Sequence, residues 1–577
     1  MDVVRRPLWV CLGSNRQEAR FPPGPLLRRK HCRHANRGPA RIQAGYPLCG
    51  HLFIMPALFA TRPAMSPTVS RPAERRQAWR NYADRRAWIM LALGFSAGVP
   101  ILLIFSSLSL WLGEAGVERK TVTMFSWAAL GYSFKFVWAP LIDALPLPVL
   151  SRRLGKRRGW LLLAQLLIIT AILCMAAVDP AQGNALAFMA AGAVLLGFSS
   201  ATQDVLIDAY RIEAAPNDNA LQSVMSATYN AGYRIGMIVA GAGSLYLATW
   251  FGSAKEHYLY EAWRDTYWIM AAVMGLGVLT TLVIREPAGN AAPKHRFGAA
   301  DNLRLLLMFV LAVSVFVFAF RTVGAWLPES STPLNALLLE TLRLGSAAAA
   351  AIGTGWLATA ANIVPARVVR QTWIEPLADF FRRYGKRAVL LLALIGLYRI
   401  SDIVAGVISN VFYADLGFSK DEIADAVKTF GVLMSIVGGF AGGLLAQRFP
   451  IMKMMMLGAV LAAATNLLFV LLAWAGHNNA VMYLAVGFDN FAAGLAGTVF
   501  VAFLSALTNI RFTAVQYALF SSIMTLLPKT LGGYSGAIVD NIGYDGFFTF
   551  TAALGVPILF LVWLADKQLD IRQPPQE

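Results

Sequence analysis

At positions 198–211 the sequence reads FSSATQDVLIDAYR, and this stretch closes an apolar run long enough to cross a bilayer. Asp204 and Asp208 are four residues apart, so on a helix they share one face. A charge at membrane depth costs roughly 2.5–3.5 kcal/mol on insertion scales, so this face has to look into protein or water. Two interpretations follow. Asp208 pairs with Arg211 near the headgroups for structural reasons, or the face lines a transport path.

The composition excludes an ordinary soluble protein. Of 577 residues, 57% are hydrophobic and only 14% are charged, and the mean hydropathy is +0.55. Apolar runs of about 20 residues recur along nearly the whole chain, and each can span the hydrocarbon core. A barrel would show short alternating segments instead. The fold class is therefore an all-α polytopic membrane protein.

The charge of +18 is unevenly distributed. Residues 1–87 hold 17 Lys and Arg against 4 Asp and Glu, which supplies +13. The high isoelectric point is therefore no sign of nucleic-acid binding, and we expect no such partner. Three cysteines lie in the N-terminal segment and the fourth, Cys174, in an apolar run, so neither a metal spacing nor a disulfide framework is present.

Residues 1–80 are rich in Arg and Pro, with no helical period and no cleavable signal-peptide pattern. This segment is either a disordered basic tail or the product of a start assigned too early, with translation from Met65. We favour the second interpretation, because the segment shares neither composition nor pattern with the rest of the chain.

The apolar runs predict about 14 spans in an order of six, two and six. Their ranges are about 88–112, 122–145, 160–178, 186–210, 221–250, 267–284, 305–320, 344–364, 388–413, 423–447, 451–474, 480–507, 512–539 and 547–565. We expect an N-terminal bundle over 88–284 and a central segment over 285–387 that contains two extra helices of lipid-facing character. A C-terminal bundle over 388–565 and a cytoplasmic tail over 566–577 follow.

The loop charges predict the orientation. Loops on the side of the N-terminus hold 21 Lys and Arg, with Arg157 and Arg211 counted among them, and the opposite loops hold 7. Positively charged loops stay in the cytoplasm, so both termini are expected there.

The loop after the second span carries a recognisable signature. The residues PLID at 140–143, followed by RRLGKRR at 152–158, resemble the signature of the major facilitator superfamily between its second and third helices. Asp143, Arg152 and Arg153 are therefore gating candidates, whereas for Arg157 and Arg158 a purely topogenic role is favoured. The equivalent stretch of the second half, 442–449, lacks the acid, so the gate is expected to be asymmetric.

Within that superfamily the chain resembles the AmpG-type muropeptide permeases from about 88 to 564. The matching stretches are 94–100, 134–143, 157–160, 200–208, 232–237, 397–402, 489–490 and 513–519. The resemblance implies proton-driven import of N-acetylglucosaminyl-anhydro-N-acetylmuramyl peptides across the bacterial inner membrane, in peptidoglycan recycling and β-lactamase induction. The wider family also includes acetyl-CoA carriers. Arg399 stands where the pattern often has lysine, which keeps the charge and alters the donor geometry.

In the major facilitator fold, helices one, four, seven and ten of the twelve common helices line the cavity. The polar membrane residues gather on these helices: Gln203, Asp204 and Asp208 on the fourth, Arg399 and Asp402 on the seventh, Asp489 and Asn490 on the tenth, and Ser96 on the first. Gly94, Gly98 and Pro100 around Ser96 permit close approach or bending, and are hinge candidates.

Further cations inside the apolar runs are Lys135, Arg234, Lys428 and Lys529. Each either neutralises a neighbouring Asp or grips a substrate carboxylate, and we take Lys135 and Arg234 as substrate candidates. Sugar rings stack on aromatic faces, and Tyr229 and Tyr233 are the aromatic candidates; most membrane tryptophans are interfacial or packing residues.

Proton coupling needs a group that titrates between two surroundings. None of the six histidines lies within a span, so a carboxylate is left. Burial disfavours the ionised carboxyl and a nearby cation favours it, so a carboxyl that changes surroundings can carry a proton. Asp204 or Asp402 is the leading candidate, followed by Asp489 and Asp208.

The leading hypothesis is a muropeptide importer. A carrier of another anionic conjugate, such as acetyl-CoA or a peptide, and a non-transporting membrane sensor are the alternatives. The sequence has no histidine metal cluster, nucleotide-binding loop or nucleophile elbow, so an enzyme is not expected. The expected partners are an anionic glycopeptide, protons and lipid, with no metal, no cofactor and a monomeric chain.

Overall fold

The computed structural model describes residues 71–568, with gaps at 119–120, 123–124, 126–127, 129–130, 183–184, 217, 255–256, 288–296, 329–332 and 533. These residues belong to one compact unit, Val69–Glu577. Residues 1–70, and with them most of the predicted extension over 1–80, lie outside the described residues. The last part of that extension belongs to a helix, α1 (Arg71–Tyr82).

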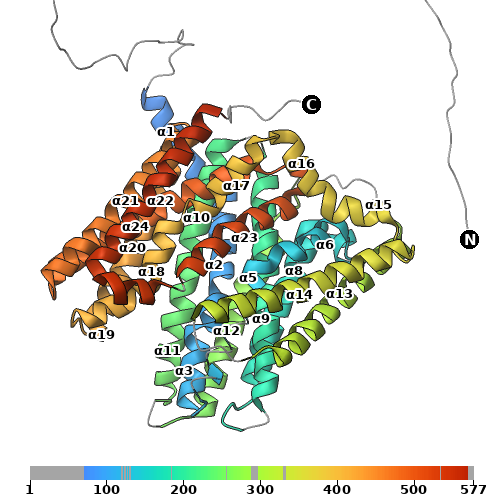
Figure 1. The fold of residues 1–577 in the computed structure, drawn as a ribbon, viewed down its shortest axis with the longest axis horizontal. Coiled ribbons are helices and arrows are strands. Elements are labelled where there is room, and N and C mark those ends of the chain that lie inside the picture. Colours follow the sequence, from blue (N-terminus) through green and yellow to red (C-terminus); the bar gives the residue numbers. More distant parts are fainter. Residues whose placement is uncertain are drawn as a thin grey trace, which may run out of the picture. The chain divides into compact units, whose positions relative to one another are not determined.

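Helices form at the apolar runs of the N-terminal bundle (Figure 1). Their bounds are α2 (Arg85–Ile104), α3 (Ser106–Glu114), α5 (Gly131–Phe134), η2 (Lys135–Val137), α6 (Ala139–Ala144), α7 (Leu150–Leu154), α8 (Lys156–Ala176), α9 (Ala185–Ala214), α10 (Asn219–Ile238), η3 (Val239–Gly243), α11 (Ser244–Trp250) and α12 (Tyr260–Val283).

The C-terminal bundle repeats this plan. It contains α17 (Arg387–Leu397), α18 (Ile400–Asp415), α19 (Lys420–Ile423), η6 (Ala424–Phe430), α20 (Gly431–Ala446), α21 (Ile451–Ala475), α22 (Asn479–Leu507), η7 (Ile510–Phe512), α23 (Thr513–Gly532) and α24 (Ser535–Gln568). The first helix of each bundle is interrupted within the membrane. The α2–α3 break at Phe105 follows Pro100, and the α17–α18 break falls at Arg399.

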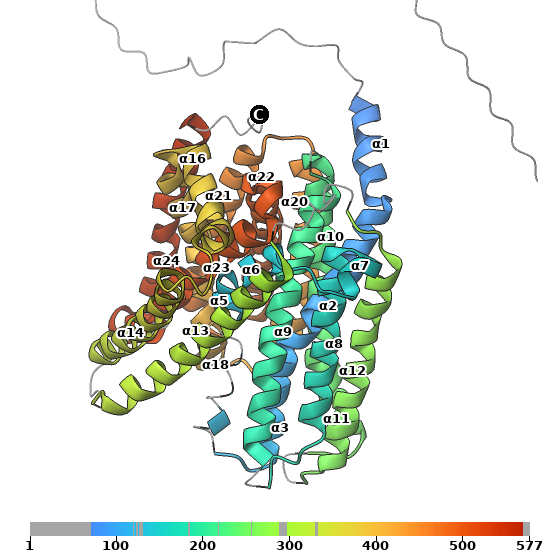
Figure 2. The same ribbon diagram turned by 90° about the vertical axis from the view of Figure 1, so that its right-hand side faces the viewer.

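The segment between the bundles forms a helical hairpin and a short amphipathic stretch. The hairpin consists of α13 (Ala299–Trp326) and α14 (Pro333–Ala360), which pack against each other and lie outside the bundles in both views (Figures 1 and 2). Leu305 and Met308 of α13 reach into a core of the N-terminal bundle. The chain then runs through α15 (Ala366–Val369), η5 (Arg370–Ile374) and α16 (Glu375–Tyr384) to α17.

Eleven helices within the described residues are long and apolar enough to cross a membrane. The polytopic all-α fold is thereby confirmed, but the expected number of 14 is not. The three expected spans that are not among the eleven are those at 122–145, 221–250 and 344–364. The first includes undescribed residues and breaks at η2, the second passes through the π-helical turn η3, and the third lies in the alanine- and glycine-rich α14.

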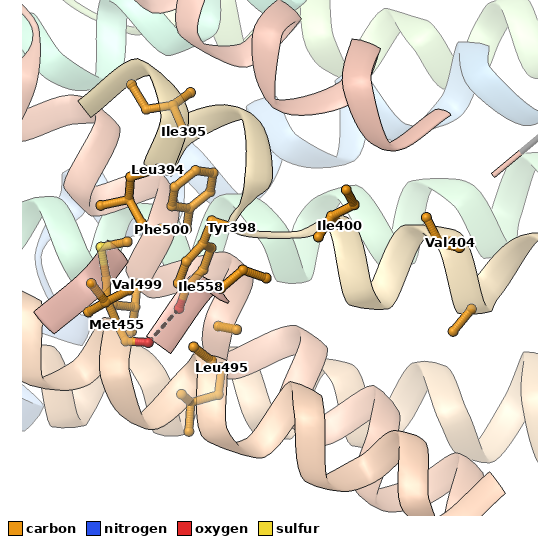
Figure 3. Packing of buried hydrophobic residues seen from close by; sticks show 14 of the residues in the cluster. Leu394, Ile395, Tyr398, Ile400, Val404, Met455, Leu495, Val499, Phe500 and Ile558 are labelled. Carbon is orange, nitrogen blue, oxygen red and sulfur yellow. Dashed lines mark hydrogen bonds between the residues drawn. The ribbon is translucent and has the colours of Figure 1, made fainter. Parts of the chain in front are cut away.

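Each bundle has its own apolar interior. In the C-terminal bundle the ring of Tyr398 stacks on Phe500, with 4.6 Å between centroids, and its hydroxyl donates to the carbonyl of Met455 at 2.9 Å (Figure 3). This contact fixes the end of α17 against α21 and α22, directly before Arg399. Because Tyr398 is held from both sides, the backbone break that follows it has a defined position.

Close approach of α2 to α10 explains two glycines. A Cβ on Gly94 would overlap the carbonyl of Tyr229, and one on Gly98 would overlap that of Tyr233. No other residue type allows the backbones to come this near. The close approach expected at these positions is present, and their predicted hinge role stays a prediction.

Candidate functional site

A polar triad, with Lys135 buried and Asp204 and Tyr229 half-buried, lies where the second, fourth and fifth passes of the N-terminal bundle meet. Lys135, in the η2 turn, forms an ion pair with Asp204 of α9. The hydroxyl of Tyr229 on α10 donates to the other carboxylate oxygen of Asp204 at 2.8 Å. Both oxygens of Asp204 therefore have a donor, and three candidates predicted separately from the sequence are in contact.

One turn further along α9, Asp208 pairs with Arg211 at 3.1 Å. Arg211 is fully buried, between the rings of Tyr229 at 5.8 Å and Tyr517 at 5.2 Å, and also donates to Ser505 at 3.3 Å. Tyr517 and Ser505 belong to the other bundle. Arg211 is thus a contact between the two halves, and its assignment to a loop in the charge count was wrong.

Gln203 lies away from the other candidates. It is fully buried, its amide nitrogen donates to the carbonyl of Ser96 at 3.1 Å, and its carbonyl accepts from the Ser96 hydroxyl at 3.1 Å. In a regular helix that carbonyl would bind the amide of residue 100, but Pro100 has none. Gln203 therefore satisfies a backbone acceptor that proline leaves open, and its contacts are those of a packing residue.

The C-terminal bundle holds its charges more loosely. Arg399 occupies the α17–α18 break, and its guanidinium lies 3.4 Å from Asp402 while its Nε has no partner. Asp489 accepts from the hydroxyl of Thr465 at 3.2 Å. The side-chain amide of Asn490 donates to the carbonyl of Val486 in its own helix.

Charges of one bundle act on charges of the other. Arg234 of α10 and Arg399 repel each other electrostatically, as do Lys135 and Lys529. Helices that break at membrane depth are tolerated where the open backbone is buried in protein or lines a cavity. Lys135 lies at η2 and Arg399 at the α17–α18 break, so both cations occupy interrupted helices. That helices one, four, seven and ten line a cavity stays a prediction. Tyr233 packs beside Tyr229, with 6.1 Å between centroids.

A second polar network lies at the end of the bundles that holds α7, α16 and the first turn of α23, which we call the basic end. Arg157 is 3% exposed and pairs with Asp143 at 2.7 Å and with Glu213 at 2.6 Å. The second oxygen of Asp143 accepts the backbone N–H of Val515 at 3.1 Å. Asp143 therefore caps the first turn of α23 from the opposite half, where helix amides lack partners.

Of the gating candidates, Asp143 belongs to this network, whereas Arg152 and Arg153 are exposed on α7. A purely topogenic role for Arg157 does not account for its burial between two acids. Sequence reasoning also gave no role to Glu213, Tyr517 or Val515. Glu213 was detectable as an acid directly after the apolar run of α9, but its partner lies 56 residues away.

Comparison with known proteins assigns the chain to a family of transporters. The sequence profile of the Major Facilitator Superfamily matches residues 119–413. Anhydromuropeptide permease of Escherichia coli (strain K12) is 29% identical over 496 residues, which cover 86% of this chain and 82% of that protein. AmpG 4 of Rickettsia felis is 29% identical over 494 residues, or 85% of this chain and 99% of that one.

Solved structures match the fold. The transporter FucP in its outward conformation aligns with a TM-score of 0.54 at 12% identity, over 84% of this chain and 99% of that one. The proton:xylose symporter XylE bound to 6-bromo-6-deoxy-D-glucose gives 0.53 at 12% identity, over 83% and 94%. At this identity the likeness concerns the fold alone.

Proposed function

The chain belongs to the Major Facilitator Superfamily and is a multi-pass membrane transporter rather than an enzyme, and from that premise we propose its substrate and coupling. We propose that it imports anhydromuropeptides from periplasm to cytoplasm across the bacterial inner membrane, driven by protons. In this proposal both termini and the basic end face the cytoplasm. The permease of E. coli, which covers most of the chain, supplies the substrate class.

The pair Arg234 and Arg399 is the observation that carries this proposal. The two arginines are like charges on opposite halves, and no acid within the described part of the chain forms an ion pair or a hydrogen bond with Arg234. The contact of Arg399 with Asp402 is long and leaves Nε unpartnered. Two arginines whose positive charge is not fully compensated by carboxylates attract an anion. Muropeptides carry several carboxylates, and an arginine can bind a carboxylate with two parallel hydrogen bonds.

Asp204 is the best candidate for the coupling proton. Its carboxylate is held by Lys135 and Tyr229 at a junction of three passes. A rocking motion that separates these passes would remove the cation and leave a buried carboxyl, which then binds a proton. Asp402, Asp489 and Asp208 are the remaining candidates.

Contacts at the basic end define the state of the carrier and are compatible with an importer. The halves are joined there by Arg211 with Ser505, by Asp143 with Val515, and by Asn81 with Gln447 at 2.8 Å. With the basic end in the cytoplasm, this arrangement is closed toward the cytoplasm. An importer takes up its substrate in that state.

Uptake of labelled anhydromuropeptide into vesicles that contain the purified chain tests the proposal. We expect accumulation under an inward proton gradient and its loss when an uncoupler is added. Uptake that ignores the gradient, or no uptake, rejects the proposal. Stronger competition by acetyl-CoA or by a free peptide than by unlabelled muropeptide would assign the carrier to another anionic conjugate.

Two variants test the proposed roles of Arg234 in substrate binding and of Asp204 in proton coupling. Arg234→Gln should raise the KM for uptake about tenfold or more, because one charge-assisted contact is lost; Arg264→Gln, which removes an exposed cation, is the matched control. Asp204→Asn should abolish accumulation against a gradient. If it still accumulates substrate with unchanged pH dependence, Asp204 is not the proton carrier.

A further inference from the structure

Helix α16 has three different faces. Phe380 and Pro376 are buried, and Phe380 packs on Phe520 of α23 with 5.1 Å between ring centroids. At its end Gly385 adopts a positive φ of 53°, and Arg387 begins the next membrane helix. The first face therefore packs α16 against α23, directly before α17 begins (Figure 2).

The second face is a polar clamp on the start of α23. Arg383 binds Asp379 at 3.0 Å and donates to the side-chain oxygen of Gln516 at 2.9 Å. The amide nitrogen of Gln516 donates in turn to Asp379 at 3.0 Å, and Asn509 donates to the same carboxylate. Gln516 lies next to Val515, which Asp143 of the other half holds. The clamp on α16 and the contact between the halves thus meet on consecutive residues.

The third face of α16 is apolar and exposed. Ile374, Leu377 and Phe381 follow one another at helical spacing, with 55%, 42% and 45% of their surface exposed. Exposed cations lie beyond both ends of this stripe: Arg370 in η5, and Lys386 and Arg387 after the turn at Gly385. An apolar stripe bordered by Lys and Arg is the pattern of a helix that lies in the plane of the membrane surface.

We propose that the exposed face of α16 binds acidic phospholipid headgroups at the basic end. Leu377 and Phe381 would enter the acyl boundary, and the three cations would hold the phosphates. Two observations favour lipid over a protein partner: α16 lies where the membrane helices beginning at Arg387 and Ile510 start, and the charge is complementary to an anionic surface.

Lipid bound at α16 also affects the contact between the two halves, because the polar clamp joins α16 to the first turn of α23. Headgroups that hold α16 at the surface also hold Asp379 and Arg383, and through Gln516 the first turn of α23. Because that turn carries the contact with Asp143, acidic lipid favours the closed basic end. The inserted segment then acts as a lipid-dependent support of the contact between the halves.

Lipid retention measures the binding directly and needs no transported substrate. The full-length chain is taken from nanodiscs of mixed phosphatidylcholine and phosphatidylglycerol, and the lipids that stay bound are counted by native mass spectrometry. We expect preferential retention of phosphatidylglycerol. The variant Arg370→Gln/Lys386→Gln/Arg387→Gln should bind it roughly a hundred-fold more weakly, about five-fold per charge, and Arg152→Gln/Arg153→Gln, altered at the same end but off α16, should keep the preference.

Equal retention of the two lipids by the unmodified chain, or an unchanged preference in the triple variant, overturns the proposal. Size-exclusion chromatography shows that each variant is folded. A dimer that dissociates on Leu377→Ser/Phe381→Ser would assign the face to a second copy of the chain and also overturn it.

The effect of acidic lipid on closure of the basic end is measured in a separate experiment. In a background with the four native cysteines replaced by serine, Asn81→Cys and Gln447→Cys report closure of the basic end by disulfide formation. Phosphatidylglycerol should raise the yield severalfold, and Gln516→Ala should remove that rise while lipid retention stays. A yield that does not respond to phosphatidylglycerol contradicts the coupling.

Discussion

The two halves of the molecule share a helical plan but treat their polar groups differently. In the N-terminal half Arg157, Glu213 and Arg211 are at most 3% exposed, and each is held by several partners or aromatic rings. In the C-terminal bundle the side chain of Arg399 is 26% exposed, and its guanidinium lies 3.4 Å from Asp402. The first half therefore buries these charges in structural contacts, whereas Arg399 keeps part of its surface free for a ligand or for water.

The difference is sharpest at the basic end. In the N-terminal half Asp143 binds Arg157 and the backbone N–H of Val515, and its gating role stays a prediction. The C-terminal half lacks that acid at 442–449. The hydrogen bonds that hold the start of α23 come instead from Asp379 and Arg383 of α16, which belongs to the inserted segment. The polar contacts at the basic end thus differ between the halves, and the asymmetric gate itself stays a prediction.

The largest effect is expected from Arg157→Gln. It leaves Asp143 and Glu213 buried without their cation, and removal of one partner from a buried pair costs about 3–5 kcal/mol. Melting of the detergent-solubilised protein measures the loss. Arg158→Gln is the matched control, because Arg158 donates to backbone carbonyls, of Thr281 and Leu282. Equal losses in the two variants would mean that the Arg157 network carries no special stability.

The next effect concerns Gln203 and the open carbonyl of Ser96. Gln203→Leu leaves that acceptor buried without a donor, at about 1–3 kcal/mol. Pro100→Ala restores a backbone N–H to the helix, so in that background the same substitution should be clearly less harmful. A double-mutant cycle of melting temperatures tests this. Strictly additive effects would show that Gln203 does not compensate for the proline.

Much of the fold could be predicted because hydropathy and loop charge are local properties of the sequence. The all-α polytopic fold and eleven of the expected spans follow from them, and the six-two-six order stays a prediction. The helix breaks at Lys135 and Arg399 could not, because an apolar run does not show where its backbone hydrogen bonds are interrupted. Their positions depend on tertiary contacts, such as Tyr398 with Phe500 and Met455.

The sequence identified most residues of the candidate site but few of the residues that they contact. Asp204 and Lys135 were singled out as charges in apolar runs and Tyr229 as an aromatic residue for sugar stacking, and the three meet in one triad through the Tyr229 hydroxyl. Gln203 was singled out for the same reason, yet it satisfies a carbonyl 107 residues away. Arg211 was counted with the loops, although its pairing with Asp208 was one of the two interpretations and is present. Its contact with Ser505 of the other half could not be read from the sequence.

A smaller effect is expected in the second half. Arg383→Gln breaks the clamp on Gln516, but its pair with Asp379 is partly solvated, so a loss of about 1–2 kcal/mol is expected. Arg382→Gln, whose cation is 65% exposed beside Glu375, should change the melting temperature little. If Arg383→Gln destabilises as strongly as Arg157→Gln, the contrast between the halves does not hold.

The smallest effect lies at the opposite end of the same half, at Glu422. Asn479 donates to it at 2.7 Å and the backbone of Ser419 at 2.8 Å, and these hydrogen bonds lower its pKa from 4.5 to about 2. A lowered folded-state pKa adds stability that is complete above the unfolded value and is lost as the pH falls through the folded value. Glu422→Gln should therefore melt slightly below the unmodified chain at pH 7, by an amount that persists at pH 4 and disappears toward pH 2. If the difference is already lost at pH 4, Glu422 titrates as an ordinary surface acid, and this end of the second half contributes no pH-dependent stability.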